Sequence, residues 1–234
     1  MISIKKLKQI VHPYHVSWLV YRYISIHITR LLIYTPITPN QISAFILLLT
    51  LVAPVLIFFN YFILGGILLT LAAVLDYVDG EVARYKKIFS VKWGEFFDWV
   101  TTWLSYFLPL LALTLNVYFK TKSTMFMIFG ILAIFGYAMV ELIRLEDIKI
   151  NPEKAVKKIK EQISFKKGLV KIYKMLFMVP YFNPMFLFFA VLNFYNFLPI
   201  KYFLLYYCIG FSLMWLLKVL YELFFGFKDE KKSK

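Results

Sequence analysis

The chain has 234 residues, of which 61% are hydrophobic and 20% aromatic, and its mean hydropathy is +0.71. This composition is typical of a polytopic membrane protein and excludes a soluble domain built around one large core. The net charge of +14 does not indicate a nucleic-acid partner, because basic loops beside anionic lipid headgroups account for it.

The N-terminal segment, residues 1–38, is basic at its start and then predicts an amphipathic helix from His15 to Tyr34. Apolar residues recur there with helical period, and Arg22, His27 and Arg30 interrupt them. We expect this helix to lie on the membrane surface, with its aromatic rings at the depth of the headgroups. It is either a lid or docking surface for a lipid substrate, or a simple anchor.

Long apolar runs predict an all-α, polytopic membrane protein with six transmembrane helices that follow this interfacial amphipathic helix. The prolines of Thr35 to Pro39 break the first helix, and Asn40 is the predicted N-cap of the first span. The spans are expected at residues 41–59, 62–84, 94–118, 124–143, 175–197 and 202–227. We therefore expect one membrane domain, with a six-helix bundle over residues 39–227 and a basic tail over residues 228–234.

The lysines and arginines gather at the two ends of the chain and in residues 84–92 and 144–174. Because such residues are enriched on the cytoplasmic side of membranes, both termini are predicted to be cytoplasmic. Residues 144–174 also predict a short basic amphipathic helix on the anionic leaflet.

Three aspartates lie beside or inside the second and third spans: Asp76, Asp79 and Asp98. A charge at the centre of a bilayer costs about 2.5–3.5 kcal/mol, so acids in such places are functional candidates. On a helix, Asp76 and Asp79 share one stripe with Gly80, Ala83 and Arg84. Two antiparallel helices with facing acidic stripes can hold a divalent cation, because carboxylate oxygens are the ligands that Mg²⁺, Mn²⁺ and Ca²⁺ prefer.

This pattern resembles the integral-membrane CDP-alcohol phosphotransferases, which carry D-x-x-D-G-x-x-A-R, a spacer, and then G-x-x-x-D-x-x-x-D. Seven of the eight signature positions match: Asp76, Asp79, Gly80, Ala83, Arg84, Gly94 and Asp98. Thr102 stands where the last Asp belongs. The resemblance extends to the stretch Pro39 to Ser43 and to the number of spans.

The resemblance implies a transferase of substituted phosphate groups. The donor would be a CDP-linked alcohol, similar to CDP-diacylglycerol or a CDP-polyol, and the acceptor a small or lipid alcohol, with release of CMP. Asp76, Asp79 and Asp98 would hold two divalent metal ions, either Mg²⁺ or Mn²⁺. Small residues at Gly80, Ala83 and Gly94 would admit the nucleotide. The distribution of basic residues also predicts that the acidic motif opens to the cytoplasm, and the composition predicts contact with membrane lipid. The resemblance further implies a homodimer.

The positions expected to be catalytic are Asp98, Arg84 and Thr102, and the last of these departs from the family pattern. In the family the fourth acid is the proposed general base, whereas a threonine hydroxyl is no base near neutral pH. Either another group or water takes the acceptor's proton, or the chain is a relative that binds CDP-alcohol, lipid or metal without turnover. Glu95, on the same stripe as Asp98, could supply the missing carboxylate.

Overall fold

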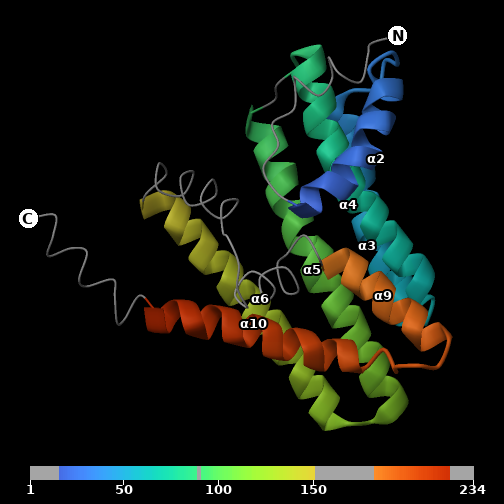
Figure 1. The fold of residues 1–234 in the computed structure, drawn as a ribbon, viewed down its shortest axis with the longest axis vertical. Helices are drawn as coiled ribbons and strands as arrows, with labels where there is room; N and C mark the ends of the chain where they lie inside the picture. The colour runs from blue at the N-terminus through green and yellow to red at the C-terminus, as the bar shows by residue number, and fades with distance from the viewer. Residues whose placement is uncertain (1–15, 89–90, 151–181, 222–234) are drawn as a thin grey trace, which may run out of the picture.

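The computed structural model describes residues 16–88, 91–150 and 182–221, except the side chains of residues 16–20, 91–95, 98, 144–150, 218 and 221. Within these residues the chain folds into helices and contains no strand, which confirms the all-α class (Figure 1). The helices are α2 (Val16–Leu32), α3 (Pro39–Phe58), α4 (Phe62–Lys86), α5 (Val91–Thr121), α6 (Thr124–Ile150), α9 (Phe182–Phe194) and α10 (Tyr202–Tyr221).

Four of the described helices contain stretches that are long and apolar enough to cross a membrane: Pro39–Phe58, Phe62–Lys86, Trp99–Thr121 and Thr124–Ile143. They correspond to the first four predicted spans. The apolar stretches of α9 and α10, Phe182–Phe194 and Tyr202–Leu217, are shorter. The predicted fifth and sixth spans extend beyond the described residues, so the total of six spans stays a prediction, as does the basic helix predicted in residues 144–174.

The start of α3 differs from the prediction that Asn40 caps it. The N-cap is Thr38, whose side chain accepts a hydrogen bond from the backbone N–H of Gln41, while the Gln41 side chain accepts one from the Thr38 N–H at 2.9 Å. Pro39 occupies the first helical position, where its missing N–H leaves no donor unsatisfied and its fixed φ suits the helix. The predicted N-cap was wrong because the reciprocal pair of Thr38 and Gln41 provides a better start.

The helices pack around two groups of buried apolar residues. The larger group joins α3, α4, α5 and α6 to α9 and α10, and aromatic rings fill much of it, such as Phe203 and Tyr207 with centroids 4.6 Å apart. The smaller group lies between α2, α3 and α4 and includes Ile26, Ile46 and Val78. In Figure 1, α6 and α10 extend together away from the other helices, and α2 lies across the end of α4.

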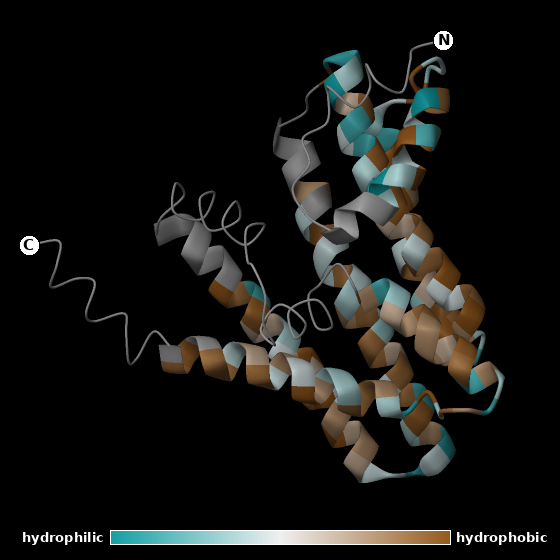
Figure 2. Ribbon diagram, in the orientation of Figure 1, coloured by the Kyte–Doolittle hydropathy of each residue, from teal (hydrophilic) through white to brown (hydrophobic). Residues whose placement is uncertain are grey.

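The surface is divided between an apolar body and a polar end. Figure 2 shows hydrophobic residues along most of α3, α4 and α10 and hydrophilic residues gathered where α2 crosses α4. Large apolar side chains such as Leu48, Val55 and Phe135 are about half exposed along the body. Such a surface suits hydrocarbon rather than water. The polar end is also the end at which α4 carries the acidic motif.

Candidate active site

The predicted stripe on α4 is an actual face of the helix. Asp76 and Arg84 are exposed and Asp79, Gly80 and Ala83 are half-buried. The intervening residues Val78, Glu81 and Val82 are buried on the opposite side. The packing of α4 therefore leaves the motif residues on the face that is open to a ligand.

Asp79 is oriented by the helix next to it. Ser43 Oγ, on α3, donates a hydrogen bond to Asp79 Oδ2 at 2.8 Å, and it also lies 3.2 Å from the carbonyl oxygen of Pro39 in its own helix. Ser43 closes the stretch from Pro39 that belongs to the sequence resemblance. The contact gives this serine a defined task, which is to restrict the rotation of the Asp79 carboxylate.

Gly80 makes room for the side chain of Arg84. A Cβ atom placed on Gly80 would lie 3.4 Å from Arg84 Nη1 and 3.6 Å from Nη2, so the guanidinium group rests on the glycine. One helical turn separates the two residues, which is the spacing that brings side chains onto one face. The motif thus holds the positive charge of Arg84 directly beside Gly80, which follows Asp79 in the chain.

The second half of the motif lies on α5, which α3 packs against as it does against α4. The backbone at Gly94, Glu95 and Asp98 is helical, but the side chains of Glu95 and Asp98 lie outside the described part. Among the described side chains, no three His, Cys, Asp or Glu residues come together as a metal site. Asp76 and Asp79 are the only predicted metal ligands described, so the predicted metal site stays a prediction.

Thr102 lies farther along α5, where this helix meets α6. Its carbonyl oxygen accepts a hydrogen bond from Ser105 Oγ at 2.9 Å and lies 3.4 Å from the hydroxyl of Tyr137 on α6. The ring of Tyr106 lies against that of Tyr137, with centroids 4.8 Å apart. Position 102 is therefore half-buried beside aromatic residues.

Residues 36–224 match a sequence model of the CDP-alcohol phosphatidyltransferase family. The chain belongs to this family. The match includes α3 and the whole acidic motif, and it confirms the resemblance seen in the sequence. Comparison with curated proteins finds no match. Members of the CDP-alcohol phosphatidyltransferase family transfer a phosphate group from a CDP-alcohol to an acceptor, and the four apolar helices agree with an integral membrane protein.

Glu81 lies within the CDP-alcohol phosphatidyltransferase motif, but sequence reasoning did not single it out. Its side chain is 2% exposed. The carboxylate accepts hydrogen bonds from Ser25 Oγ at 2.9 Å and from Thr29 Oγ1 at 2.7 Å, both on α2. Hydrogen bonds to a charged group stabilise a fold by about 1.5–3 kcal/mol each, so this contact is a strong attachment between α2 and α4.

The polar residues of α2 are arranged differently from what their positions in the sequence suggested. Arg22, expected at the membrane surface, is buried, whereas His27 is exposed. Burial lowers the pKa of the Arg22 guanidinium, and the nearby charge of Glu81 raises it in part. The spacing of Arg22, Ser25 and Thr29 places all three on one helix face, and this polar face was the available signal for a buried acidic partner.

Lys86 holds the end of α4 against the linker between α2 and α3. Its Nζ donates to the carbonyl oxygens of Thr35 at 2.6 Å and Ile37 at 2.7 Å. Sequence analysis placed this lysine among the residues of a basic cytoplasmic segment. In the structure its charge satisfies carbonyl groups that the prolines of the linker leave outside any helix.

Proposed function

We propose that this protein transfers a substituted phosphate group from a CDP-linked alcohol to an acceptor alcohol, in a reaction that requires Mg²⁺ or Mn²⁺ and releases CMP. The observation that carries the proposal is the open face of α4, where Asp76, Asp79, Gly80, Ala83 and Arg84 lie together at the polar end of the bundle. The family match over residues 36–224 supports the same chemistry.

The donor set on α4 fits a hard divalent cation. Asp76 and Asp79 offer carboxylate oxygens one turn apart on the same helix face, and Ser43 restrains one of them. Asp98 on α5 is the proposed third ligand. Two ions held by these residues would neutralise the charge that develops on the phosphate oxygens as the donor's pyrophosphate bond breaks.

The remaining motif residues bind and orient the donor. In the proposed step the acceptor's hydroxyl oxygen attacks the phosphorus distal to cytidine, the bond from that phosphorus to the CMP oxygen breaks, and the hydroxyl proton is lost. Arg84, held against Gly80, would attract the pyrophosphate. Small residues at Gly80, Ala83 and Gly94 would let the nucleotide approach the helices closely.

Removal of the acceptor's hydroxyl proton is the step at which this chain departs from the family pattern. Thr102 cannot accept it near neutral pH, because a hydroxyl group is too weak a base. Water or Glu95, which precedes Asp98 by one turn, would accept it. A second candidate function follows from the same residue: a relative that binds CDP-alcohol, lipid or metal without turnover.

The site is proposed to face the cytoplasm, where soluble nucleotides are found, with both termini on that side. The basic residues at the end of α4, Arg84, Lys86 and Lys87, agree with this orientation. A homodimer in the membrane completes the proposal.

The test is CMP release by the purified full-length protein in lipid nanodiscs with Mg²⁺ or Mn²⁺. CDP-diacylglycerol, CDP-archaeol and CDP-inositol would each be paired with glycerol phosphate, serine or inositol phosphate. Release that stops on addition of EDTA supports the transferase, and the productive pair identifies the substrates. Metal-dependent binding of a donor with no CMP from any pair would favour the relative without turnover.

A further inference from the structure

We infer that Glu81 is a positioning residue, whose buried carboxylate holds α2 against the motif helix and so fixes Asp79 and Arg84 for the transfer. The inference rests on the proposed function, and it concerns how the site is held together. It assigns a task to α2 that goes beyond those of a membrane anchor.

The contact defines the position of α2 in two ways. Ser25 and Thr29 are one helical turn apart, and each bonds a different oxygen of Glu81, Oε1 and Oε2 respectively. Two bonds to points along one helix fix both its rotation and its position along its own axis. Ser25 and Thr29 are completely buried, so water does not compete for these bonds.

Burial of the Glu81 carboxylate makes loss of this contact energetically unfavourable. An acid enclosed by protein is unfavourable unless it keeps its hydrogen bonds and its counter-charge. Arg22, one turn before Ser25 and also buried, interacts electrostatically with Glu81 and with Arg84. Since Arg22 and Arg84 repel each other, α2 also disfavours movement of the Arg84 guanidinium away from Gly80 and toward α2.

The segment after α2 continues along the motif helix. Lys86 binds the carbonyl groups of Thr35 and Ile37, and Ser43 at the start of α3 binds Asp79. The chain from residue 25 to residue 43 is thus attached to α4 at three levels. A shift of α2 would be passed through the short linker to the start of α3, and from there to the Asp79 carboxylate.

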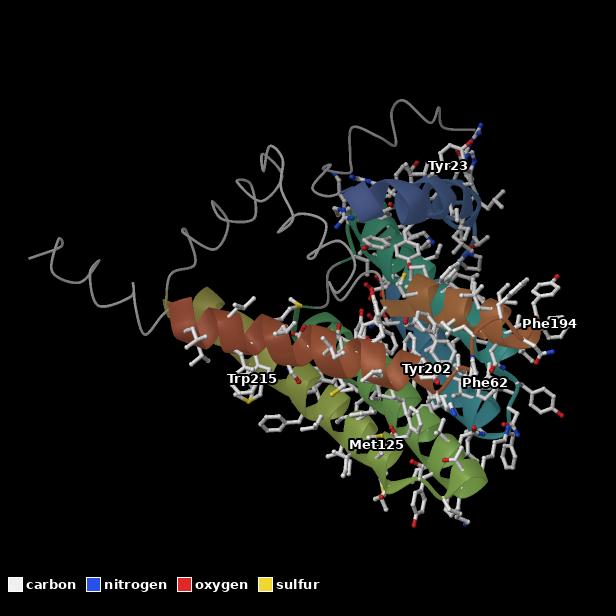
Figure 3. All side chains as sticks on the ribbon, turned by 60° about the horizontal axis from the view of Figure 1, so that its bottom comes forward. Tyr23, Phe62, Met125, Phe194, Tyr202 and Trp215 are labelled. Carbon is white, nitrogen blue, oxygen red and sulfur yellow. The ribbon has the colours of Figure 1, made fainter. Side chains whose placement is uncertain are left out.

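An anchor would not need this arrangement. The outer face of α2 carries exposed Tyr23, Ile24 and Leu31, and Tyr23 points away from the bundle (Figure 3). That apolar face is enough to hold a helix in a membrane surface. The inner face carries the buried polar residues Arg22, Ser25 and Thr29, and the last two contact Glu81 within the motif. Ser25 and Thr29 also precede the family match, which begins at residue 36.

The experiment measures kcat and donor KM for CMP release in five variants. Two are Glu81→Ala and Glu81→Gln, and a third is the pair Ser25→Ala with Thr29→Val. The fourth is the triple variant, which combines this pair with Glu81→Ala, and the fifth is Thr50→Val as a control. Glu81→Ala should lower kcat about 10- to 100-fold, because small misplacements of reacting groups have effects of that size. KM should change less than about three-fold, since Asp79 and Arg84 would be displaced slightly rather than removed.

The other variants separate positioning from general stability. Glu81→Gln should stay within about five-fold of wild type, because its amide can bond both hydroxyl groups in the same place. The Ser25 and Thr29 pair should reproduce the loss of Glu81→Ala, and the triple variant should add nothing to it. Thr50→Val removes a buried hydroxyl that bonds only within α3 and should leave kcat unchanged.

A readout without turnover keeps the two proposals apart. In a Cys208→Ser background, Ile26→Cys places a thiol on the buried side of α2. Maleimide should label it at least about ten-fold faster in the Ser25 and Thr29 pair than in the otherwise wild-type chain, because opening exposes the site. Equal labelling rates, or a kcat unaffected in folded Glu81→Ala protein, would overturn the inference. Absence of CMP release from the wild type would instead count against the proposed function, and the labelling rates would still decide whether Glu81 holds α2.

Discussion

The hydroxyl of Ser43 donates a 2.8 Å hydrogen bond to Asp79, and this contact joins the first residues of α3 to the acidic motif of α4. The two residues are 36 positions apart in the sequence. Their contact explains how a serine that is no metal ligand in the proposed site can still influence the chemistry. It sets the orientation of a proposed ligand, as partners behind a metal ligand commonly do.

Ser43→Ala should therefore weaken metal use more than it weakens the fold. Loss of such a partner lowers metal affinity or activity about 10- to 100-fold, so the Mn²⁺ concentration that gives half-maximal CMP release should rise by at least about ten-fold. Ser43→Thr keeps the hydroxyl and should restore most of the affinity. An unchanged Mn²⁺ requirement in Ser43→Ala would show that Asp79 does not depend on this bond.

Gly80 offers a test in which activity and stability change in opposite directions. Replacing a glycine inside a helix by alanine stabilises the helix by about 0.5–1 kcal/mol, and the new Cβ would lie 3.4 Å from Arg84 Nη1, an ordinary contact. Gly80→Ala should therefore raise the melting temperature slightly and lower kcat/KM only a few-fold. Gly80→Val should displace the guanidinium and lower kcat/KM by about 100-fold or more. Equal activity of the two variants would contradict the proposed role of Arg84.

The predicted difference from the family pattern lies in a single side chain, that of Thr102. General base catalysis contributes about 10²- to 10⁴-fold, so Thr102→Asp should raise kcat by at least about ten-fold if no other group already serves as base. The backbone contacts of this residue with Ser105 and Tyr137 do not depend on its side chain and should persist. A kcat that falls or stays level would mean that the proton leaves by another route, and Glu95→Gln would then show whether that carboxylate is the acceptor.

The spans were the most predictable part of the fold because they are long and local in sequence. Residues 124–143, taken as the fourth span from hydropathy, form the apolar stretch of α6, and the span predicted at residues 62–84 ends two residues short of α4. The helix start at Thr38 was missed, since it depends on a reciprocal bond with Gln41 rather than on residue type alone. The residues that cap a helix lie within a short segment, but several residues in that segment are suitable N-caps, so the sequence alone does not choose between them.

The candidate site was predictable only where its residues follow a periodic pattern. The open face of α4 follows from spacing alone, and the structure confirms that its residues share it. Glu81 was missed because its partners Ser25 and Thr29 lie 56 and 52 positions away, and no local pattern connects them. The burial of Arg22 was missed for the same reason, because the packing of α2 on α4 encloses this side chain.

The most direct test of the transferase proposal is the rate of CMP release by wild-type protein and by Asp79→Asn, each with Mg²⁺ and with EDTA, with a productive donor and acceptor pair. Lys122→Gln, a change at an exposed residue directly after the C-terminal end of α5, serves as the control. The proposal predicts release that requires Mg²⁺ in the wild type and the control, and a loss of about 100-fold or more in Asp79→Asn. Release that continues in EDTA, or an Asp79→Asn variant as fast as the wild type, would contradict a metal-dependent transfer at this motif.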